Sequence, residues 1–294
     1  MNDTGPSGLS RLQVAAAGAL FTFFWASGFV SAKYGLPYAE PFTFLSLRFV
    51  IAILLLAPIA ALWRARWPRS PAALGHIVVA GLLVQTIYLI GVFQAIRFGI
   101  STGVIALIVG LQPLLTGALA SAALGERATR GQWIGLALGF AGLALVVAEK
   151  VDFGAGDGVG AAFGVAGLIG ITIGTLYQKR FCAGMDIRSG VIIQNAASLA
   201  VIGVLALAFE TREVQWTGDF VFALTWSAIG LSVIAIALYY VLVRRGAAAK
   251  VTSLIYLSPP TTALMGWAVF GETFSALALA GMGVAVAGVA LANR

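Results

Sequence analysis

The chain has 294 residues, of which 60% are hydrophobic and only 10% are charged, and its mean hydropathy is +0.98. A soluble domain usually carries about 25% charged residues, so this composition excludes an ordinary soluble protein. It predicts a polytopic membrane protein, because each helix that crosses a bilayer takes roughly 20 apolar residues. The single cysteine, Cys182, and the single histidine, His76, leave no residues for a disulfide, a multi-cysteine metal site or a histidine cluster. We therefore expect neither a metal nor another cofactor.

Residues 1–11 are polar and hold glycine, serine and proline, so we expect a disordered cytoplasmic tail. Apolar runs separated by charged or turn-forming residues then predict ten transmembrane helices. Their approximate ranges are 12–33, 41–63, 74–97, 102–124, 130–149, 158–179, 187–209, 219–243, 249–270 and 274–292. The expected fold is an all-α membrane protein with a first five-helix repeat at 12–149, a periplasmic linker at 150–157 and a second five-helix repeat at 158–294.

The distribution of basic residues predicts the orientation in the membrane. With both termini in the cytoplasm, thirteen of the 18 lysines and arginines fall in or beside the inner segments and four in or beside the outer ones. The positive-inside rule therefore favours cytoplasmic N- and C-termini. The same distribution explains the isoelectric point near 9.9, so nucleic acid is not an expected partner, whereas the lipid bilayer is.

The two halves of the chain share a skeleton at an offset of 146 positions. The pattern of proline and Gly-Glu in 113–126 returns in 259–272, and Lys33 corresponds to Lys179. Five helices per half is an odd number, so the second half enters the membrane from the opposite side. Inverted repeats of this kind are the geometric basis of alternating access in many transporters.

Prolines fall about halfway along the fourth and ninth predicted helices, at Pro113 and at Pro259 and Pro260. Proline removes a backbone donor and disrupts the helix, and interrupted helices in corresponding places of two halves point to a binding site at the membrane midplane. Gln112 immediately precedes the first proline and is positioned to contact a substrate or to satisfy the backbone. For each proline alone, a kink without a ligand role remains the simpler explanation.

Arg48 is the one charged residue well inside a predicted helix, and no Asp or Glu lies near the middle of any helix. The absence of buried carboxylates argues against a proton-driven pump and against a membrane hydrolase. Arg48 should face the interior of the bundle, where it either attracts a substrate carboxylate or bonds to backbone carbonyls as a structural residue. The repeat places the neutral Gln194 at the corresponding position in the second half.

Aromatic and amide side chains inside the predicted helices complete the set of candidate binding residues. Trp25 lies in the first helix, and Gln85 and Tyr88 share one face of the third because they are three residues apart. Tyr239 lies in the eighth helix, and Tyr256 lies three residues before Pro259. For each mid-helix tyrosine, packing in the core and contact with a ligand are comparable explanations.

Small residues recur every four positions in the fifth predicted helix, at Gly131, Gly135 and Gly139, and the tenth repeats the theme. Such spacing lets helices approach closely. We interpret both faces as packing surfaces away from substrate, and we expect a monomer rather than a dimer.

Together these features resemble the EamA-type, ten-helix members of the drug/metabolite transporter superfamily. The resemblance covers residues 12–292 and rests on Trp25 followed by Lys33, on Pro41 with Arg48-Phe49, and on the repeated segments 113–126 and 259–272. Among them the chain is most similar to the YddG-type bacterial exporters of aromatic amino acids.

The resemblance implies a basket-shaped bundle in the bacterial inner membrane, with a central cavity lined by helices one to four and six to nine. The candidate binding residues that it implies are Trp25, Arg48, Gln85, Tyr88, Gln112, Gln194, Tyr239 and Tyr256. The second half departs from the pattern, because Ile171 stands where the repeat would place a tryptophan and Gln194 replaces the arginine.

The leading functional hypothesis is a facilitative carrier that exports amino acids, especially those with aromatic or other apolar side chains. A zwitterion needs few fixed charges, and an amphipathic metabolite suits an aromatic cavity with amide groups. The alternatives are export of another small amphipathic metabolite or drug, or a membrane scaffold or sensor without transport. An enzyme is not expected, because acid–base residues are missing from the membrane interior.

Overall fold

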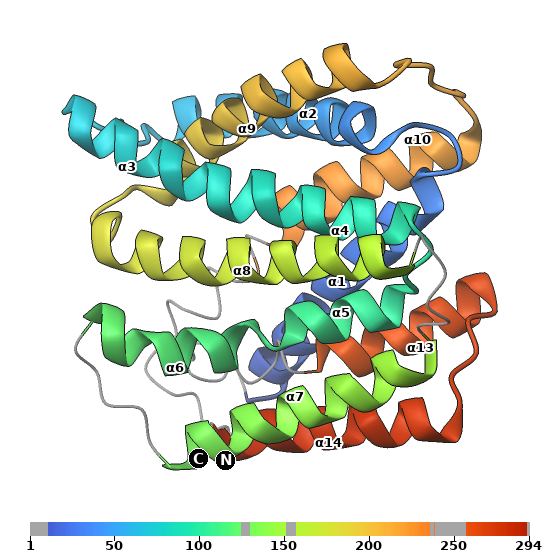
Figure 1. Ribbon diagram of the computed structural model, residues 1–294. Coiled ribbons are helices and arrows are strands. Elements are labelled where there is room, and N and C mark those ends of the chain that lie inside the picture. The colour runs from blue at the N-terminus through green and yellow to red at the C-terminus, as the bar shows by residue number, and fades with distance from the viewer. Residues whose placement is uncertain (1–10, 125–129, 151–156, 236–237, 239–256, 293–294) are drawn as a thin grey trace.

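The computed structural model describes residues 11–124, 130–150, 157–235, 238 and 257–292 (Figure 1). Within these residues every regular element is a helix, and the only β-type pairing is an isolated bridge between Ala39 and Val214. The predicted all-α class is therefore confirmed.

In the first half, five predicted spans correspond to eight helical segments. The segments are α1 (Arg11–Gly35), α2 (Pro41–Leu62), α3 (Pro71–Gly81), η1 (Leu82–Ile87), α4 (Tyr88–Arg97), α5 (Thr102–Gly110), α6 (Gln112–Leu124) and α7 (Arg130–Lys150). The π-helical η1 joins α3 and α4 into one continuous rod, and α5 and α6 together form the fourth span. Proline begins α2 and α3, where the missing N–H group would have no partner within the helix.

The described part of the second half follows the same plan. Its segments are α8 (Asp157–Phe181), α9 (Ile187–Phe209), α10 (Gly218–Thr225), η2 (Trp226–Ala235), α13 (Ser258–Phe270) and α14 (Ala276–Ala292). The end of the predicted eighth span and the beginning of the ninth lie outside the described residues.

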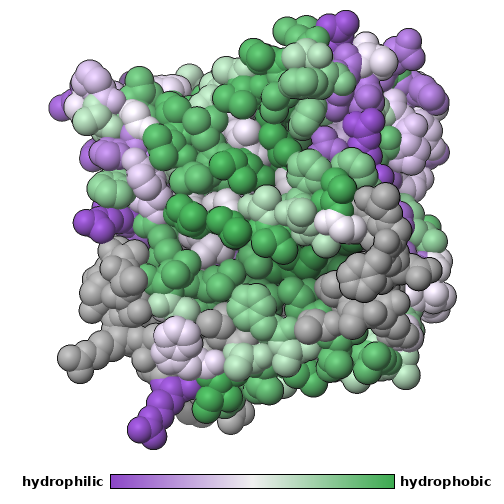
Figure 2. Space-filling model, in the orientation of Figure 1, coloured by the Kyte–Doolittle hydropathy of each residue, from purple (hydrophilic) through white to green (hydrophobic). Residues whose placement is uncertain are grey.

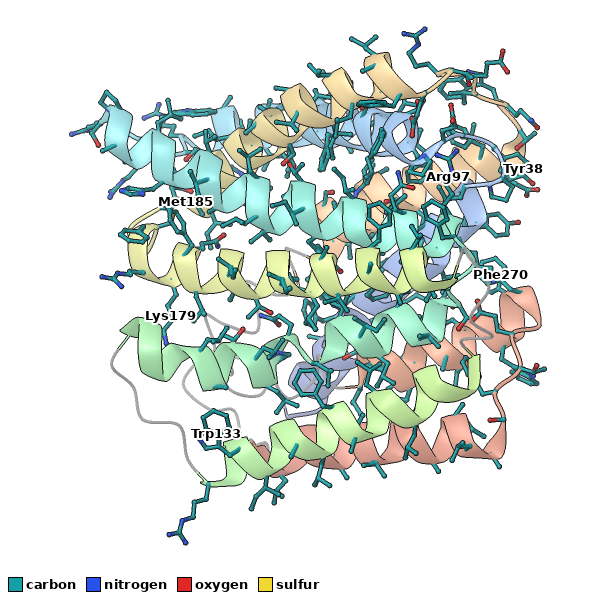
Figure 3. The ribbon with its side chains drawn as sticks, viewed as in Figure 1. Tyr38, Arg97, Trp133, Lys179, Met185 and Phe270 are labelled. Carbon is teal, nitrogen blue, oxygen red and sulfur yellow. The ribbon has the colours of Figure 1, made fainter. Side chains whose placement is uncertain are left out.

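The helices are long, apolar and roughly aligned, as a bilayer requires. Five segments are long and apolar enough to cross a membrane, namely Pro41–Leu62, Pro71–Arg97, Thr102–Leu119, Gly158–Phe181 and Ile187–Phe209. Figure 2 shows hydrophobic side chains across the middle of one face and hydrophilic ones gathered towards the two ends of the helices. We call these ends the Lys33 end, which carries Tyr38, Arg97 and Phe270, and the Lys179 end, which carries Met185 (Figure 3).

The packing of the helices repeats under exchange of the two halves. Two contacts join a helix to its own repeat partner, because α2 packs on α9 and α7 on α14; in addition, α5 of the fourth span packs on α13 of the ninth. Other contacts come in exchanged pairs, because η1 and α3 pack on α8 as their counterparts η2 and α10 pack on α1. This is the contact pattern of two intertwined repeats related by a pseudo-two-fold axis.

Irregularities of the backbone also repeat at the offset of 146 positions. Leu111 separates α5 from α6 with φ −76° and ψ −10°, and Leu257 precedes α13 with φ −81° and ψ −8°. The π-helical segment 82–87 corresponds to 228–233, which lies within η2. π-Helical turns are rare and are frequently found at functional sites.

Carboxylates close corresponding loops at the two ends of the α2–α9 pair. Glu40 precedes α2 and accepts a 2.7 Å hydrogen bond from the Thr211 N–H, which follows α9. Asp186 precedes α9 and accepts a 3.0 Å bond from the Arg66 N–H, which follows α2. Glu40 and Asp186 are themselves 146 positions apart, so the two hydrogen bonds correspond to each other and lie at opposite ends of the α2–α9 pair.

Glycine faces bring α7 and α14 into direct backbone contact. A Cβ atom on Gly142 would collide with the carbonyl oxygen of Gly281, and one on Gly288 would lie 2.7 Å from the oxygen of Gly135. Large apolar side chains elsewhere on this pair, such as Trp133, are exposed, as expected of a surface that faces lipid.

Candidate functional site

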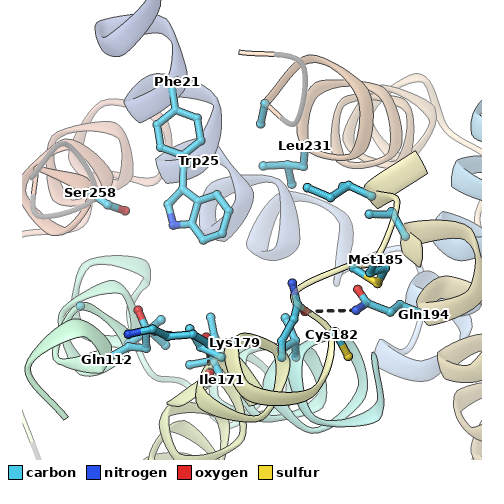
Figure 4. Close-up of a pocket in the computed structure, with 18 of the residues that line it drawn as sticks. Phe21, Trp25, Gln112, Ile171, Lys179, Cys182, Met185, Gln194, Leu231 and Ser258 are labelled. Atoms are coloured by element: carbon cyan, nitrogen blue, oxygen red, sulfur yellow. Dashed lines mark hydrogen bonds between the residues drawn. The ribbon is translucent and has the colours of Figure 1, made fainter. Parts of the chain in front are cut away.

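A cavity of about 640 Å³ lies between helices of both halves (Figure 4). Its apolar wall includes Phe21, Trp25 and Phe29 from α1, Ile171 from α8 and Leu231 from η2. The three α1 side chains share one face because they are spaced four residues apart. The rings of Phe21 and Trp25 are in contact, with centroids 5.9 Å apart.

Amide and hydroxyl groups from both halves form the polar part of the lining. The Gln112 amide nitrogen donates hydrogen bonds to the hydroxyl oxygens of Thr116, at 3.1 Å, and Thr175, at 3.3 Å. The Gln194 amide nitrogen donates to the side-chain oxygen of Gln178 at 3.1 Å. These bonds connect α6 with α8 and α8 with α9, so the cavity has amide groups held in fixed positions.

Lys179 is the only charged side chain among the described residues that line the cavity, and no carboxylate is among them. It lies in the last turn of α8 and extends towards α6 (Figures 3 and 4). A cavity with an apolar wall, several amides and a single cation suits a small amphipathic molecule that carries a carboxylate.

The cavity opens at one end of the molecule and is closed at the other. Lys179 and Ala183, which line it at the Lys179 end, are exposed. Phe29 and Ala106, which line it nearest the Lys33 end, are only 4% and 2% exposed. In this structure the cavity is therefore accessible from the Lys179 end.

The cavity includes some of the residues predicted from the sequence and leaves others out. Trp25, Gln112 and Gln194 line it, whereas Arg48, Gln85 and Tyr88 do not. The remaining two candidates, Tyr239 and Tyr256, lie outside the described residues.

The three prolines singled out in the sequence stand beside the cavity, at the beginnings of helices. Pro113 is the second residue of α6 and follows the lining residue Gln112, and Pro259 and Pro260 follow the lining residue Ser258 at the beginning of α13. At these positions the prolines begin a helical segment after the interruption at Leu111 or Leu257.

Arg48 lies on α2, away from this cavity and close enough to Tyr88 for an electrostatic interaction. Its Nε atom is buried without a hydrogen-bond partner, as are the hydroxyl oxygens of Ser46, Thr86 and Ser227. Thus the buried side-chain atoms without partners, among the residues that the structure describes, gather on α2 and on the two π-helical segments.

Lys179 and Phe21 were not among the binding residues predicted from the sequence. The correspondence of Lys179 to Lys33 in the repeat was the sequence signal that distinguished it. The four-residue spacing of Phe21, Trp25 and Phe29 was a readable signal for one aromatic face of α1.

Comparisons with known proteins agree with this architecture. The model of the EamA-like transporter family matches residues 13–148 and again residues 158–294. The chain is 28% identical to the "Uncharacterized transporter YvbV" of Bacillus subtilis (strain 168), over 97% of its own length and 93% of that protein. It is 27% identical to the "Uncharacterized inner membrane transporter YedA" of Escherichia coli (strain K12), over 93% of its own length and 89% of that protein.

Two further similarities are more distant. A "Probable amino-acid metabolite efflux pump" of Salmonella typhimurium is 29% identical, over 44% of this chain and 40% of that protein. A protein of known crystal structure aligns over 96% of this chain and 97% of its own, with a TM-score of 0.67 and 18% identity, so the two share a fold.

Proposed function

The chain belongs to the EamA-like transporter family of the drug/metabolite transporter superfamily, and from this premise we propose that it exports amino acids, preferably those with aromatic or other apolar side chains. The observation that carries the proposal is the cavity: an aromatic wall from α1, fixed amides from Gln112 and Gln194, and one cation, Lys179. Its volume of about 640 Å³ falls within the range of about 300–1,000 Å³ that is typical of small-molecule sites.

The arrangement of charges supports a zwitterionic substrate. A carboxylate is attracted by Lys179, and an ammonium group finds amide, hydroxyl and backbone oxygens beside Gln112 and Ser258. A substrate with several negative charges would need more cations than the described lining supplies. An amphipathic metabolite or drug of similar size that is not an amino acid is the alternative.

The inverted repeat supports alternating access. In the proposed orientation both termini and the Lys179 end face the cytoplasm, so the cavity takes up substrate from inside and releases it at the Lys33 end. Membership of the family makes the protein an integral membrane transporter, and YedA of Escherichia coli is named as an inner-membrane protein. The partial similarity to an amino-acid metabolite efflux pump supports the direction and the substrate class.

We propose that transport is facilitative and that the chain is not an enzyme and acts as a monomer. A proton-driven exporter normally titrates a carboxylate or histidine beside its substrate, and no such group is among the described lining residues. The pairing of α7 with α14 uses their glycine faces inside one chain, so these faces are not free for dimerisation.

The proposal is tested by exchange of labelled phenylalanine in proteoliposomes that contain the purified protein, with and without an imposed pH gradient. We expect exchange above that of empty liposomes, competition by unlabelled tryptophan and leucine, and no accumulation driven by the gradient. Accumulation that follows the gradient would contradict facilitative transport. Exchange no faster than in empty liposomes would refute the amino-acid proposal and favour another metabolite.

A further inference from the structure

Glu272 is a buried carboxylate at the Lys33 end that none of the preceding description uses. Its side chain is 6% exposed, and its Oε1 atom accepts a 2.7 Å hydrogen bond from the Lys33 ammonium group. The Thr102 N–H donates to Oε1 at 3.0 Å, and the Thr102 hydroxyl donates to Oε2 at 2.9 Å. We call Lys33, Thr102 and Glu272 the Glu272 cluster.

The cluster joins three helices from both halves of the chain. Lys33 lies in the last turn of α1, Thr102 is the first residue of α5, and Glu272 follows α13. Gly271, in the left-handed conformation with φ +64°, ends α13 and directs the chain back over it. A Cβ atom on Gly266 of α13 would lie 2.5 Å from both Glu272 Oε2 and Thr102 Oγ1, so the carboxylate packs directly on the helix.

Two of these helices, α1 and α5, line the closed end of the cavity, and α13 packs on both. Phe29 lies four residues before Lys33 on α1, and Ala106 lies four residues after Thr102 on α5, so each is one helical turn from the cluster. One turn rises about 5.4 Å along the helix axis, which places the cluster directly beyond the buried floor of the cavity. A path from the floor of the cavity that runs between α1 and α5 to the Lys33 end separates the groups that Glu272 holds together.

The α2–α9 pair provides a contrast. It is tied at both ends, by Glu40 to Thr211 at the Lys33 end and by Asp186 to Arg66 at the other. Ties at both ends are expected of helices that move as one unit. The Glu272 cluster holds α1, α5 and α13 at the end where the cavity is closed, while the cavity itself lies between α1 and α8 towards the open end. The positions that correspond to Glu272 and Thr102 in the other half, Glu126 and Ala248, lie outside the described residues.

We propose that the Glu272 cluster is the latch of the gate at the Lys33 end, closed in this structure and broken when the cavity opens there. The inference rests on the proposed transport cycle but not on the identity of the substrate. The latch holds through a short ion pair with Lys33 and two hydrogen bonds that Thr102 donates, and these act together only while α1, α5 and α13 are in contact. For the cavity to open at each end in turn, the free energy lost when the latch breaks must be offset by contacts that form when the cavity closes at the Lys179 end.

The test measures cysteine labelling in the purified full-length protein, with the native cysteine removed by Cys182→Ser. One chain carries Phe29→Cys, at the closed floor of the cavity, and a second carries Ala183→Cys, at its open mouth. Each is combined with Glu272→Gln, which keeps the shape of the side chain but removes its charge. The matched control is Glu213→Gln, which removes one negative charge from an exposed residue in the connection from α9 to α10.

We expect Glu272→Gln to raise the maleimide labelling rate at position 29 roughly tenfold and to lower it at position 183, because loss of a charged hydrogen bond shifts the balance towards the state open at the Lys33 end. Lys33→Gln should act in the same direction, and Glu213→Gln should change neither rate.

Unchanged labelling at position 29 in both latch variants would overturn the proposal. A rise at both positions would also overturn it, because local unfolding rather than gating produces that pattern. No amino acid is needed in this assay, so a reciprocal change without phenylalanine exchange would refute the proposed substrate and leave the latch standing.

Discussion

Replacement of Arg48 by methionine tests whether this arginine serves transport or only supports the structure. Arg48 lies inside α2 with its Nε atom buried and unpartnered, and no carboxylate of the described residues forms an ion pair with it. A buried donor without a partner costs about 1–3 kcal/mol, so removal of the guanidinium should relieve this penalty rather than lose a bond. Methionine retains most of the apolar stem, which limits the cavity that the substitution creates.

We therefore expect Arg48→Met to leave the melting temperature unchanged or to raise it by a few degrees, since about 1 kcal/mol corresponds to roughly 2–4 °C in a chain of this size. Transport should fall at least tenfold per molecule, because an ionisable side chain inside a membrane helix usually marks a substrate or ion pathway. The assays are thermal unfolding in detergent and phenylalanine exchange in proteoliposomes at matched protein content. Arg97→Met, which removes an exposed arginine 3.5 Å from Glu40, is the control. A melting temperature lowered by more than about 5 °C, with exchange per folded molecule unchanged, would refute the reasoning and make Arg48 structural.

Two further predictions follow from packing and from charge. Gly288→Leu should reduce the amount of folded protein in the membrane severalfold, because its Cβ atom would meet the backbone of α7. Gly283→Leu on the same helix should be tolerated, since nothing lies within 4 Å of a Cβ atom there. Equal yields of the two variants, measured by fluorescence-detected size exclusion, would contradict the packing of α7 on α14. Acidification should open the latch. Burial alone would raise the pKa of Glu272, but the bonds from Lys33 and Thr102 outweigh it and hold the pKa below its ordinary value of 4.5. A carboxylate with a lowered pKa stabilises the closed latch fully above its ordinary pKa and loses this effect as the pH falls through the lowered value. Labelling of Phe29→Cys should therefore be constant from about pH 8 to 6, after correction for the reagent, and rise only below about pH 4.5; a rise near neutral pH would show that another group controls the gate.

The sequence predicts the helices well where apolar length and charged breaks coincide. The second and seventh predicted spans, 41–63 and 187–209, match α2 and α9 almost to the residue. The π-helical segments η1 and η2 were not predicted, because an extra residue in a helical turn leaves no mark on an apolar sequence such as 82–87. Their presence at corresponding places in both halves became visible only from the backbone.

Only part of the candidate site could be predicted from the sequence, and the reason is physical. Trp25, Gln112 and Gln194 were identifiable because aromatic and amide side chains inside apolar helices need partners, and all three line the cavity. Arg48 and Tyr88 are equally unusual in sequence, yet they lie elsewhere in this conformation. A transporter shows only one face of its path at a time, and the sequence does not specify which face a given structure will show.

The central claim, that amino acids cross through this cavity, is tested most directly by comparing two tryptophan substitutions. Trp25→Ala removes the largest aromatic group of the cavity wall, and Trp133→Ala removes a 56% exposed tryptophan from α7, away from the cavity. The account predicts that phenylalanine exchange per reconstituted molecule falls at least tenfold in the first variant and stays at the wild-type level in the second. Wild-type exchange in Trp25→Ala, with protein of normal stability, would show that the substrate takes another path.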